Sequence, residues 1–147
     1  MRTHFPFSVA RKQFSALYDR VEGGSSAVVQ RRGSRPIAVV DAEELERLLA
    51  LHFPFSVQVR VKEDSVAMWC EHLPVHGQAN DLEEATRALA AELIEYAETW
   101  ESELQFAPNH KQAWGFVRRI ELAGSEEAVA DMLIADTEAA SGTASTT

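Results

Sequence analysis

The sequence predicts an α+β protein built from two small domains in series. Short β-branched stretches alternate with amphipathic helical segments, a pattern typical of mixed domains rather than of a helical bundle. Helix-start motifs, in which Asp is followed three positions later by Glu, occur twice, at residues 41–44 and 81–84. With 147 residues, of which 46% are hydrophobic, the chain can bury one ordinary core or two small ones.

The first fifty residues predict a strand, a helix, a hairpin and a second helix. Pro6 restricts the short apolar segment around it to the edge of a sheet. Ser8 is the expected cap of the first helix, whose apolar stripe is Ala10, Phe14, Leu17, Tyr18 and Val21. Two β-branched runs, 27–30 and 36–40, flank an arginine-rich turn. The motif at 41–44 then opens the second helix.

The second half predicts strands followed by helices. Apolar and polar residues alternate over 55–62, which indicates a half-buried strand, and 66–71 is the expected return strand. Residues 72–79 are interpreted as a loop with a short third strand. A long helix is expected behind the motif at 81–84, because apolar residues keep helical spacing through Trp100.

These elements predict a first domain over 1–51, a second over 52–106, a helical segment over 107–138 and a loose, disordered tail over 139–147. The helical segment is either part of a core or an anchor that orders on a partner. The hexapeptide His-Phe-Pro-Phe-Ser-Val occurs at 4–9 and again at 52–57. Its first serine is expected at a helix cap and its second in a strand.

Charge is segregated along the chain. Residues 1–50 carry eight basic and six acidic residues, or +2, whereas residues 51–147 carry six basic and seventeen acidic residues, or −11. We therefore expect a polyanion to meet the first part and a cationic protein to meet the second. The candidate DNA contacts are the basic residues on the first helix and in the turn: Arg11, Lys12, Arg31, Arg32 and Arg35.

Three stretches of the first domain resemble the N-terminal domain of the Phd/YefM family of antitoxins. They are Ser-Val-Ala-Arg-Lys-Gln-Phe-Ser-Ala-Leu at 8–17, Val-Val-Gln-Arg-Arg-Gly-Ser-Arg-Pro-Ile-Ala-Val-Val at 28–40, and Asp-Ala-Glu-Glu-Leu-Glu-Arg-Leu-Leu at 41–49. The resemblance implies a β-α-β-β-α domain that dimerises, binds operator DNA and represses its own operon. It also implies that Arg11 and either Arg31 or Arg32 contact DNA. A domain this small buries little surface, which independently favours a homodimer or a higher oligomer.

Residues 55–104 resemble the small HicB-like antitoxin domain, on the alternating strand, the return strand and Asn80-Asp-Leu-Glu-Glu-Ala. The resemblance implies a partial ribonuclease-H-like sheet with a long helix that binds a protein toxin. No basic residue lies between Arg87 and Lys111, whereas five glutamates do. This run is either a solvated face or a surface for a cationic, ribonuclease-type toxin. The candidate toxin contacts are Glu95, Glu98, Glu101, Trp114 and Phe116.

Other classes of function are disfavoured. The single cysteine excludes an internal disulfide, and burial of Cys70 on the strand is favoured over a metal site shared with His72 and His76. A nuclease site would use Asp64, Glu71 and Asp81, but two of these are explained by a turn and a helix cap. We therefore predict no enzyme activity, no metal and no cofactor. No apolar run reaches the ~18 residues of a membrane span, so a cytoplasmic protein is expected. The second hypothesis is a stand-alone DNA-binding regulator whose C-terminal domain binds a ligand or oligomerises.

Overall fold

The computed structural model describes residues 4–144 and divides into two compact units, Met1–Leu48 and Leu49–Thr147. We call them unit 1 and unit 2. The boundary lies inside helix α3 (Ala42–His52). The described residues form two three-stranded sheets and six α-helices, so the α+β class is confirmed.

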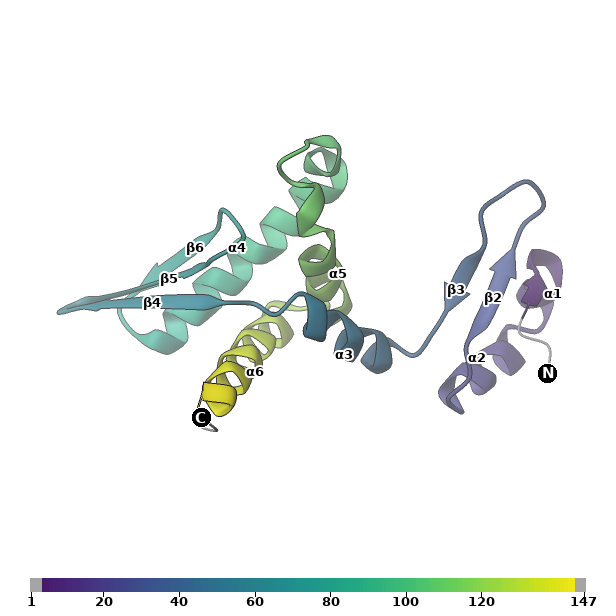
Figure 1. Cartoon of the computed structure of the whole chain (residues 1–147), viewed down its shortest axis with the longest axis horizontal. Helices are drawn as coiled ribbons and strands as arrows, with labels where there is room; N and C mark the ends of the chain where they lie inside the picture. The colour runs from purple at the N-terminus through teal and green to yellow at the C-terminus, as the bar shows by residue number, and fades with distance from the viewer. Residues whose placement is uncertain (1–3, 145–147) are drawn as a thin grey trace. The chain divides into compact units, whose positions relative to one another are not determined.

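Unit 1 is built on a sheet with the strand order β1-β2-β3. Figure 1 labels β2 and β3 of this sheet. Strand β1 (His4–Pro6) lies at the edge of the sheet, as expected for a strand that contains proline. It runs parallel to β2 (Ala27–Gln30). Strand β2 pairs antiparallel with β3 (Ile37–Val39), and Val28 lies opposite Ala38. The arginine-rich segment is therefore the loop of a β-hairpin, as predicted.

The first helical segment of unit 1 differs from the prediction. It consists of two helices, α1 (Phe7–Lys12) and α2 (Phe14–Glu22), separated at Gln13. Ser8 is not the cap, because the helix begins at Phe7 with Pro6 preceding it and no side chain caps it. The proline ring already holds φ near the helical value, and the helix starts at Phe7, two residues earlier than a cap at Ser8 would allow.

The core of unit 1 is smaller than the predicted apolar stripe. Ala10, Leu17 and Val21 are buried together with Ala27 of the sheet. Phe14 and Tyr18, which belong to the same predicted stripe, are 61% and 57% exposed. The small three-stranded sheet covers only one side of the helices, so these two rings lie outside the core.

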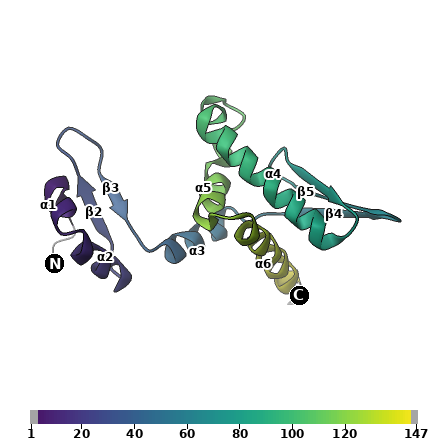
Figure 2. The ribbon, with the colours of Figure 1, turned by 180° about the vertical axis from the view of Figure 1, so that it is seen from behind.

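Unit 2 begins with an antiparallel sheet of strands β4 (Val57–Lys62), β5 (Ser65–Cys70) and β6 (His76–Ala79) in that order. The long helix α4 (Leu82–Ser102) lies along one face of this sheet in both views (Figures 1 and 2). The Asp81 carboxylate accepts a hydrogen bond from the Glu84 N–H at 2.8 Å, which confirms the second predicted helix start.

The C-terminal part of the chain belongs to the core of unit 2. Two 3-10 turns, Leu104–Phe106 and Lys111–Ala113, lead from α4 to α5 (Trp114–Ala123), and α6 (Glu126–Ala144) follows. Both helices bury residues against α4: Val117, Ile120, Val129 and Leu133. Of the two alternatives for the C-terminal segment, the structure therefore shows a core element.

The expected loose tail is largely helical. Helix α6 continues through Ala144, and the Ser141 hydroxyl donates to the Thr137 carbonyl at 3.1 Å within it. Alanine has the highest intrinsic helix propensity, so an alanine-rich end extends an existing helix without burying anything. The prediction of disorder from residue 139 is wrong for 139–144, and residues 145–147 lie outside the described part of the chain.

A buried ion pair joins α5, α6 and the segment before β4. Arg119 is 2% exposed, and its guanidinium binds both carboxylate oxygens of Asp136, at 2.6 and 3.1 Å. The guanidinium also donates to the Phe53 carbonyl at 2.9 Å, and the Phe55 N–H donates to Asp136 at 2.7 Å. The pair therefore fixes the second hexapeptide copy against the two C-terminal helices.

The two identical hexapeptides adopt different conformations. In the first copy, β1 ends at Pro6 and α1 begins at Phe7. The second copy starts at the end of α3 and leads into β4, with Phe55 buried in the core of unit 2. Tertiary contacts, and not the local sequence, decide between the two conformations.

Candidate nucleic-acid interface and protein-binding surface

All five predicted DNA contacts lie exposed on two neighbouring segments of unit 1. Arg11 and Lys12 form the last turn of α1, and Arg31, Arg32 and Arg35 lie in the hairpin loop. Within residues 4–144, none of these five side chains forms an ion pair with a carboxylate. No Asp or Glu occurs in 1–18 or in 23–40, so no acidic residue of either segment opposes this positive charge.

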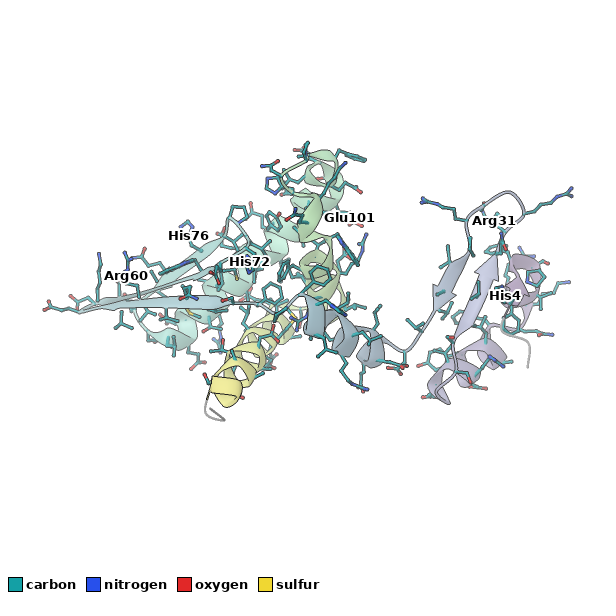
Figure 3. All side chains as sticks on the ribbon, viewed as in Figure 1. His4, Arg31, Arg60, His72, His76 and Glu101 are labelled. Atoms are coloured by element: carbon teal, nitrogen blue, oxygen red, sulfur yellow. The ribbon has the colours of Figure 1, made fainter. Side chains whose placement is uncertain are left out.

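Arg31 connects the two basic segments. Its guanidinium carbon lies 4.4 Å from the centre of the Phe7 ring, at the start of α1. Such a cation–π contact holds the charge in place without neutralising it. Figure 3 labels Arg31 on the hairpin and shows long side chains with terminal nitrogens extending from the loop. Within the loop, the Gln30 amide donates to the Ser34 carbonyl at 3.3 Å. The sequence did not indicate the Phe7 contact, because the two residues are far apart in the chain.

Unit 1 also carries an exposed apolar face that sequence reasoning assigned to the core. Phe14, Tyr18 and Val40 are exposed, and together with Val39 they line a hollow of about 320 Å³. The residues that line this hollow lie on α2, at the end of β3, in the segment after β3 and at the start of α3. A face of this kind, on a unit with few buried residues, is a natural protein-binding surface.

The acidic candidates of unit 2 lie exposed along α4. Glu95, Glu98 and Glu101 are exposed, and Glu98 and Glu101 border a shallow hollow of about 170 Å³ with Glu121 of α5. The Arg118 guanidinium forms an ion pair with Glu121 at 2.5 Å. The hollow therefore lies between the acidic face of α4 and the Arg118–Glu121 ion pair of α5.

The two aromatic candidates of unit 2 are placed differently. Trp114 is half exposed at the start of α5, and its ring meets the edge of Phe53 at a centroid distance of 5.1 Å. Phe116 is buried between Phe53 and Phe55, at 5.5 and 5.1 Å. Trp114 is thus accessible to a partner, whereas Phe116 supports the surface from within the core.

A hollow of about 760 Å³ in unit 2 was not indicated by the sequence. It is lined by His52, His72, His110 and Tyr96, with apolar walls that include Phe116. The Tyr96 hydroxyl lies 2.9 Å from Nδ1 of His110, and burial raises the pKa of this tyrosine. These residues come from widely separated segments, so only the fold brings them together.

The residues considered for metal or nuclease chemistry have structural roles. Cys70 is buried, and burial raises the pKa of its thiol to about 12, so it stays a protonated, weak metal ligand. Glu71 accepts a hydrogen bond from the Ser56 hydroxyl at 2.9 Å. No group of three or more His, Cys, Asp or Glu residues suited to a metal occurs in the described part of the chain. No helix in that part is long and apolar enough to cross a membrane.

The comparisons with known proteins agree with the fold. No curated protein matches the sequence. The crystal structure of an antitoxin part of a proposed toxin/antitoxin system from Syntrophomonas wolfei subsp. wolfei is similar in fold, with a TM-score of 0.68 and 17% identity; the match covers 90% of this chain and 96% of that chain.

A family model described as PHD-like, "Antitoxin of toxin-antitoxin, RelE / RelB, TA system", matches residues 1–135. These antitoxins are not enzymes, which confirms the prediction that the chain has no catalytic function. An antitoxin implies a cognate toxin as its partner. The chain therefore belongs to the PHD-like family of antitoxins of toxin–antitoxin systems.

Proposed function

We propose that this antitoxin represses its own operon by binding operator DNA through unit 1 as a homodimer. The observation that carries the proposal is the cluster of five exposed basic residues on α1 and the hairpin, with no acidic residue in either segment. Arginine forks fit phosphate oxygens and guanine edges. A dimer would present two such surfaces to two half-sites, as the resemblance to Phd/YefM antitoxins implies.

The exposed apolar face of unit 1 supports dimerisation. Phe14, Tyr18 and Val40 leave large apolar surfaces in water, and a two-fold contact between copies would bury them. Such a contact would also stabilise a unit that has only four residues in its buried core. The same rings that lie outside the core of one copy would then complete a core between two copies.

The proposed role of unit 2 is to bind and neutralise the toxin. Its three-stranded antiparallel sheet followed by a long helix is the arrangement implied by the resemblance to HicB-like antitoxins. The exposed glutamates of α4 would face a cationic ribonuclease-type toxin, and half-exposed Trp114 would add an apolar anchor. An antitoxin that binds operator DNA and a cognate toxin would act in the cytoplasm.

The DNA-binding role is tested with the double variant Arg11→Ala, Arg31→Ala and DNA from upstream of the antitoxin gene. Because the variant removes a cation from each basic segment, we expect at least a tenfold loss of affinity in a gel-shift or fluorescence assay. Arg87→Ala, which removes an exposed cation of unit 2, is the control and should leave the affinity unchanged. Unchanged DNA binding by the double variant, or parallel loss of toxin binding, would contradict the proposal.

The toxin-binding role is tested by co-expression with the product of the neighbouring gene. The wild type should restore growth and co-purify with that product. The triple variant Glu95→Gln, Glu98→Gln, Glu101→Gln should weaken the complex at least tenfold, because it removes the charges that attract a cationic partner. Glu126→Gln with Glu127→Gln removes exposed charge from α6 and serves as the matched control. Equal affinity of the two variants would exclude the α4 surface.

A stand-alone regulator is the second candidate, and the 760 Å³ hollow of unit 2 is the observation in its favour. Its size suits a small ligand, and its mixed histidine, tyrosine and aromatic lining offers both polar and apolar contacts. Under this alternative, neither neighbouring gene product would form a complex with the chain, whereas DNA binding would still depend on Arg11 and Arg31.

A further inference from the structure

The strand β4 of unit 2 is an open sheet edge with an apolar face. It has β5 on one side and no strand on the other among the described residues. Of the three valines that alternate with polar residues on β4, Val57 is partly buried, whereas Val59 and Val61 are 46% and 72% exposed, which is unusual for apolar residues on a sheet. Val57 and Val59 border an apolar hollow of about 180 Å³, together with Met68, Leu133 and Ile134.

The backbone of the same valines points away from the sheet. The Glu71 N–H donates to the Ser56 carbonyl at 3.0 Å, one residue beyond the pair Val57–Cys70. In an antiparallel ladder, residues that bond to the neighbouring strand alternate with residues that do not. Gln58, Arg60 and Lys62 therefore bond to β5, as Ser56 does. Val57, Val59 and Val61 direct their N–H and C=O groups to the open edge.

We infer that β4 pairs antiparallel with β4 of a second copy of this chain, with Val59 opposite Val59 across a two-fold axis. In this register Val57 lies opposite Val61 of the second copy, so all three valines meet valines on one face. Each of the three opposing pairs can exchange two hydrogen bonds through the outward backbone groups. The two sheets then form one continuous sheet of six strands.

The charges on the other face favour this register and this occupant. Gln58 lies opposite Arg60 of the second copy. Ser56 lies opposite Lys62 of the second copy, and Glu71 is hydrogen-bonded to Ser56, so that lysine can form an ion pair with Glu71. A register centred on Arg60 would place two arginines directly opposite each other and would align fewer valines. Strand β4 is thus complementary to itself in one register. Pairing with a strand of an unrelated toxin would not require such self-complementarity.

The inference concerns unit 2 alone and does not depend on the DNA-binding proposal. Full-length Val59→Cys and Val61→Cys variants are oxidised and compared as covalent dimers on a non-reducing gel. Opposed positions lie about 5.5 Å apart between Cα atoms, within the range of a disulfide, whereas two copies of position 61 lie about 14 Å apart. We expect position 59 to cross-link at least ten times faster. Cys70 is buried and remains in both variants.

The comparison distinguishes a fixed register from random collision between copies. Position 61 is the more exposed of the two, so random collision would cross-link it at least as fast as position 59. Equal rates, or faster cross-linking at position 61, would overturn the inference. Light scattering of the full chain gives a second readout. In a Phe14→Lys background, which disrupts the proposed contact through unit 1, Val59→Lys should lower the molar mass about twofold at equal concentration, whereas Leu122→Lys, on the partly exposed face of α5, should not.

An unchanged mass for Val59→Lys would also overturn the inference. If that variant kept its mass but lost the complex with the neighbouring gene product, the edge would take a toxin strand instead of a second copy. Failure of dimerisation through unit 1 would lower the parental mass but leave the contrast between positions 59 and 61 intact.

Discussion

Arg119 and Asp136 carry opposite charges into the interior of unit 2. Removal of one of these charges has a larger effect there than removal of both. The guanidinium is 2% exposed and satisfies a carboxylate and the Phe53 carbonyl at once. A buried pair of this kind contributes modestly compared with a well-packed apolar pair, but loss of one partner leaves a charge without compensation. The pair therefore acts as a constraint on which segments pack together.

Asp136→Asn tests this constraint. The amide keeps the shape of the side chain but leaves the Arg119 charge buried, so we expect the free energy of unfolding to fall by about 3–5 kcal/mol. Urea unfolding followed by circular dichroism measures the change. Arg87→Ala breaks the exposed pair of Arg87 and Glu83, 2.8 Å apart, and should cost less than about 0.5 kcal/mol. Similar losses in the two variants would show that burial does not control the energy of the Arg119–Asp136 pair.

The individual side chains of the candidate DNA interface were predictable, because a permanent charge in a turn or at a helix end has no other stable place than the surface. The sequence could not reveal the contact between Arg31 and Phe7, or the ion pair of Arg119 and Asp136. Both join residues from distant parts of the chain, and neither leaves a periodic or spacing signal. The burial of Phe116 and the exposure of Phe14 were missed for the same reason.

Strand β6 and helix α4 approach each other closely at Gly77. A Cβ atom added there would lie 2.4 Å from the Leu89 backbone nitrogen and 2.8 Å from the Ala85 carbonyl oxygen. These are backbone atoms, which cannot swing aside as a flexible side chain does. The absence of a side chain at this position lets the helix lie directly on the sheet.

Gly77→Ala should consequently push α4 away from β6 and destabilise unit 2 by about 1–3 kcal/mol or more. Thermal unfolding measures the loss. Gly142→Ala is the matched control, because a Cβ there meets no atom within 4 Å and alanine favours the helical backbone of α6. An unchanged melting temperature for Gly77→Ala would mean that the helix and the strand can separate at no cost.

Elements with a strong local signal were predicted well. The hairpin of β2 and β3, the alternating strands of unit 2 and the helix capped by Asp81 all follow from turn residues, period-two alternation or a capping motif. The break at Gln13 was not predicted, because it has neither proline nor glycine to mark it. The helical end of α6 was not predicted, because its alanines and small polar residues show no apolar periodicity and bury nothing.

The distribution of charge over the whole chain bears on how the protein meets DNA. Unit 1 carries +2 and unit 2 carries −11 in a chain whose isoelectric point is about 5.0. A protein with this net charge is repelled by DNA at long range, so the short-range contacts of the basic cluster must supply the attraction. Sequence alone revealed this segregation, because it depends on composition and not on folding.

Salt should therefore weaken operator binding steeply. With about six phosphate contacts per dimer, the slope of log K against log salt concentration should be near −5. Titrations of the wild type between about 50 and 200 mM salt give the slope, and Arg11→Ala should make it shallower by about 2, one contact per protomer. A slope near zero would mean that phosphate contacts do not hold the complex.

The duplicated hexapeptide has a practical consequence for the use of peptides derived from this protein. Phe7 and Phe55 hold the same place in the two copies, and an arginine lies over each ring, Arg31 at 4.4 Å and Arg119 at 5.2 Å. One ring nevertheless sits at the surface and the other in the interior. A synthetic peptide with this six-residue sequence, or an antibody raised against it, would correspond to two different conformations in the protein and would be specific for neither.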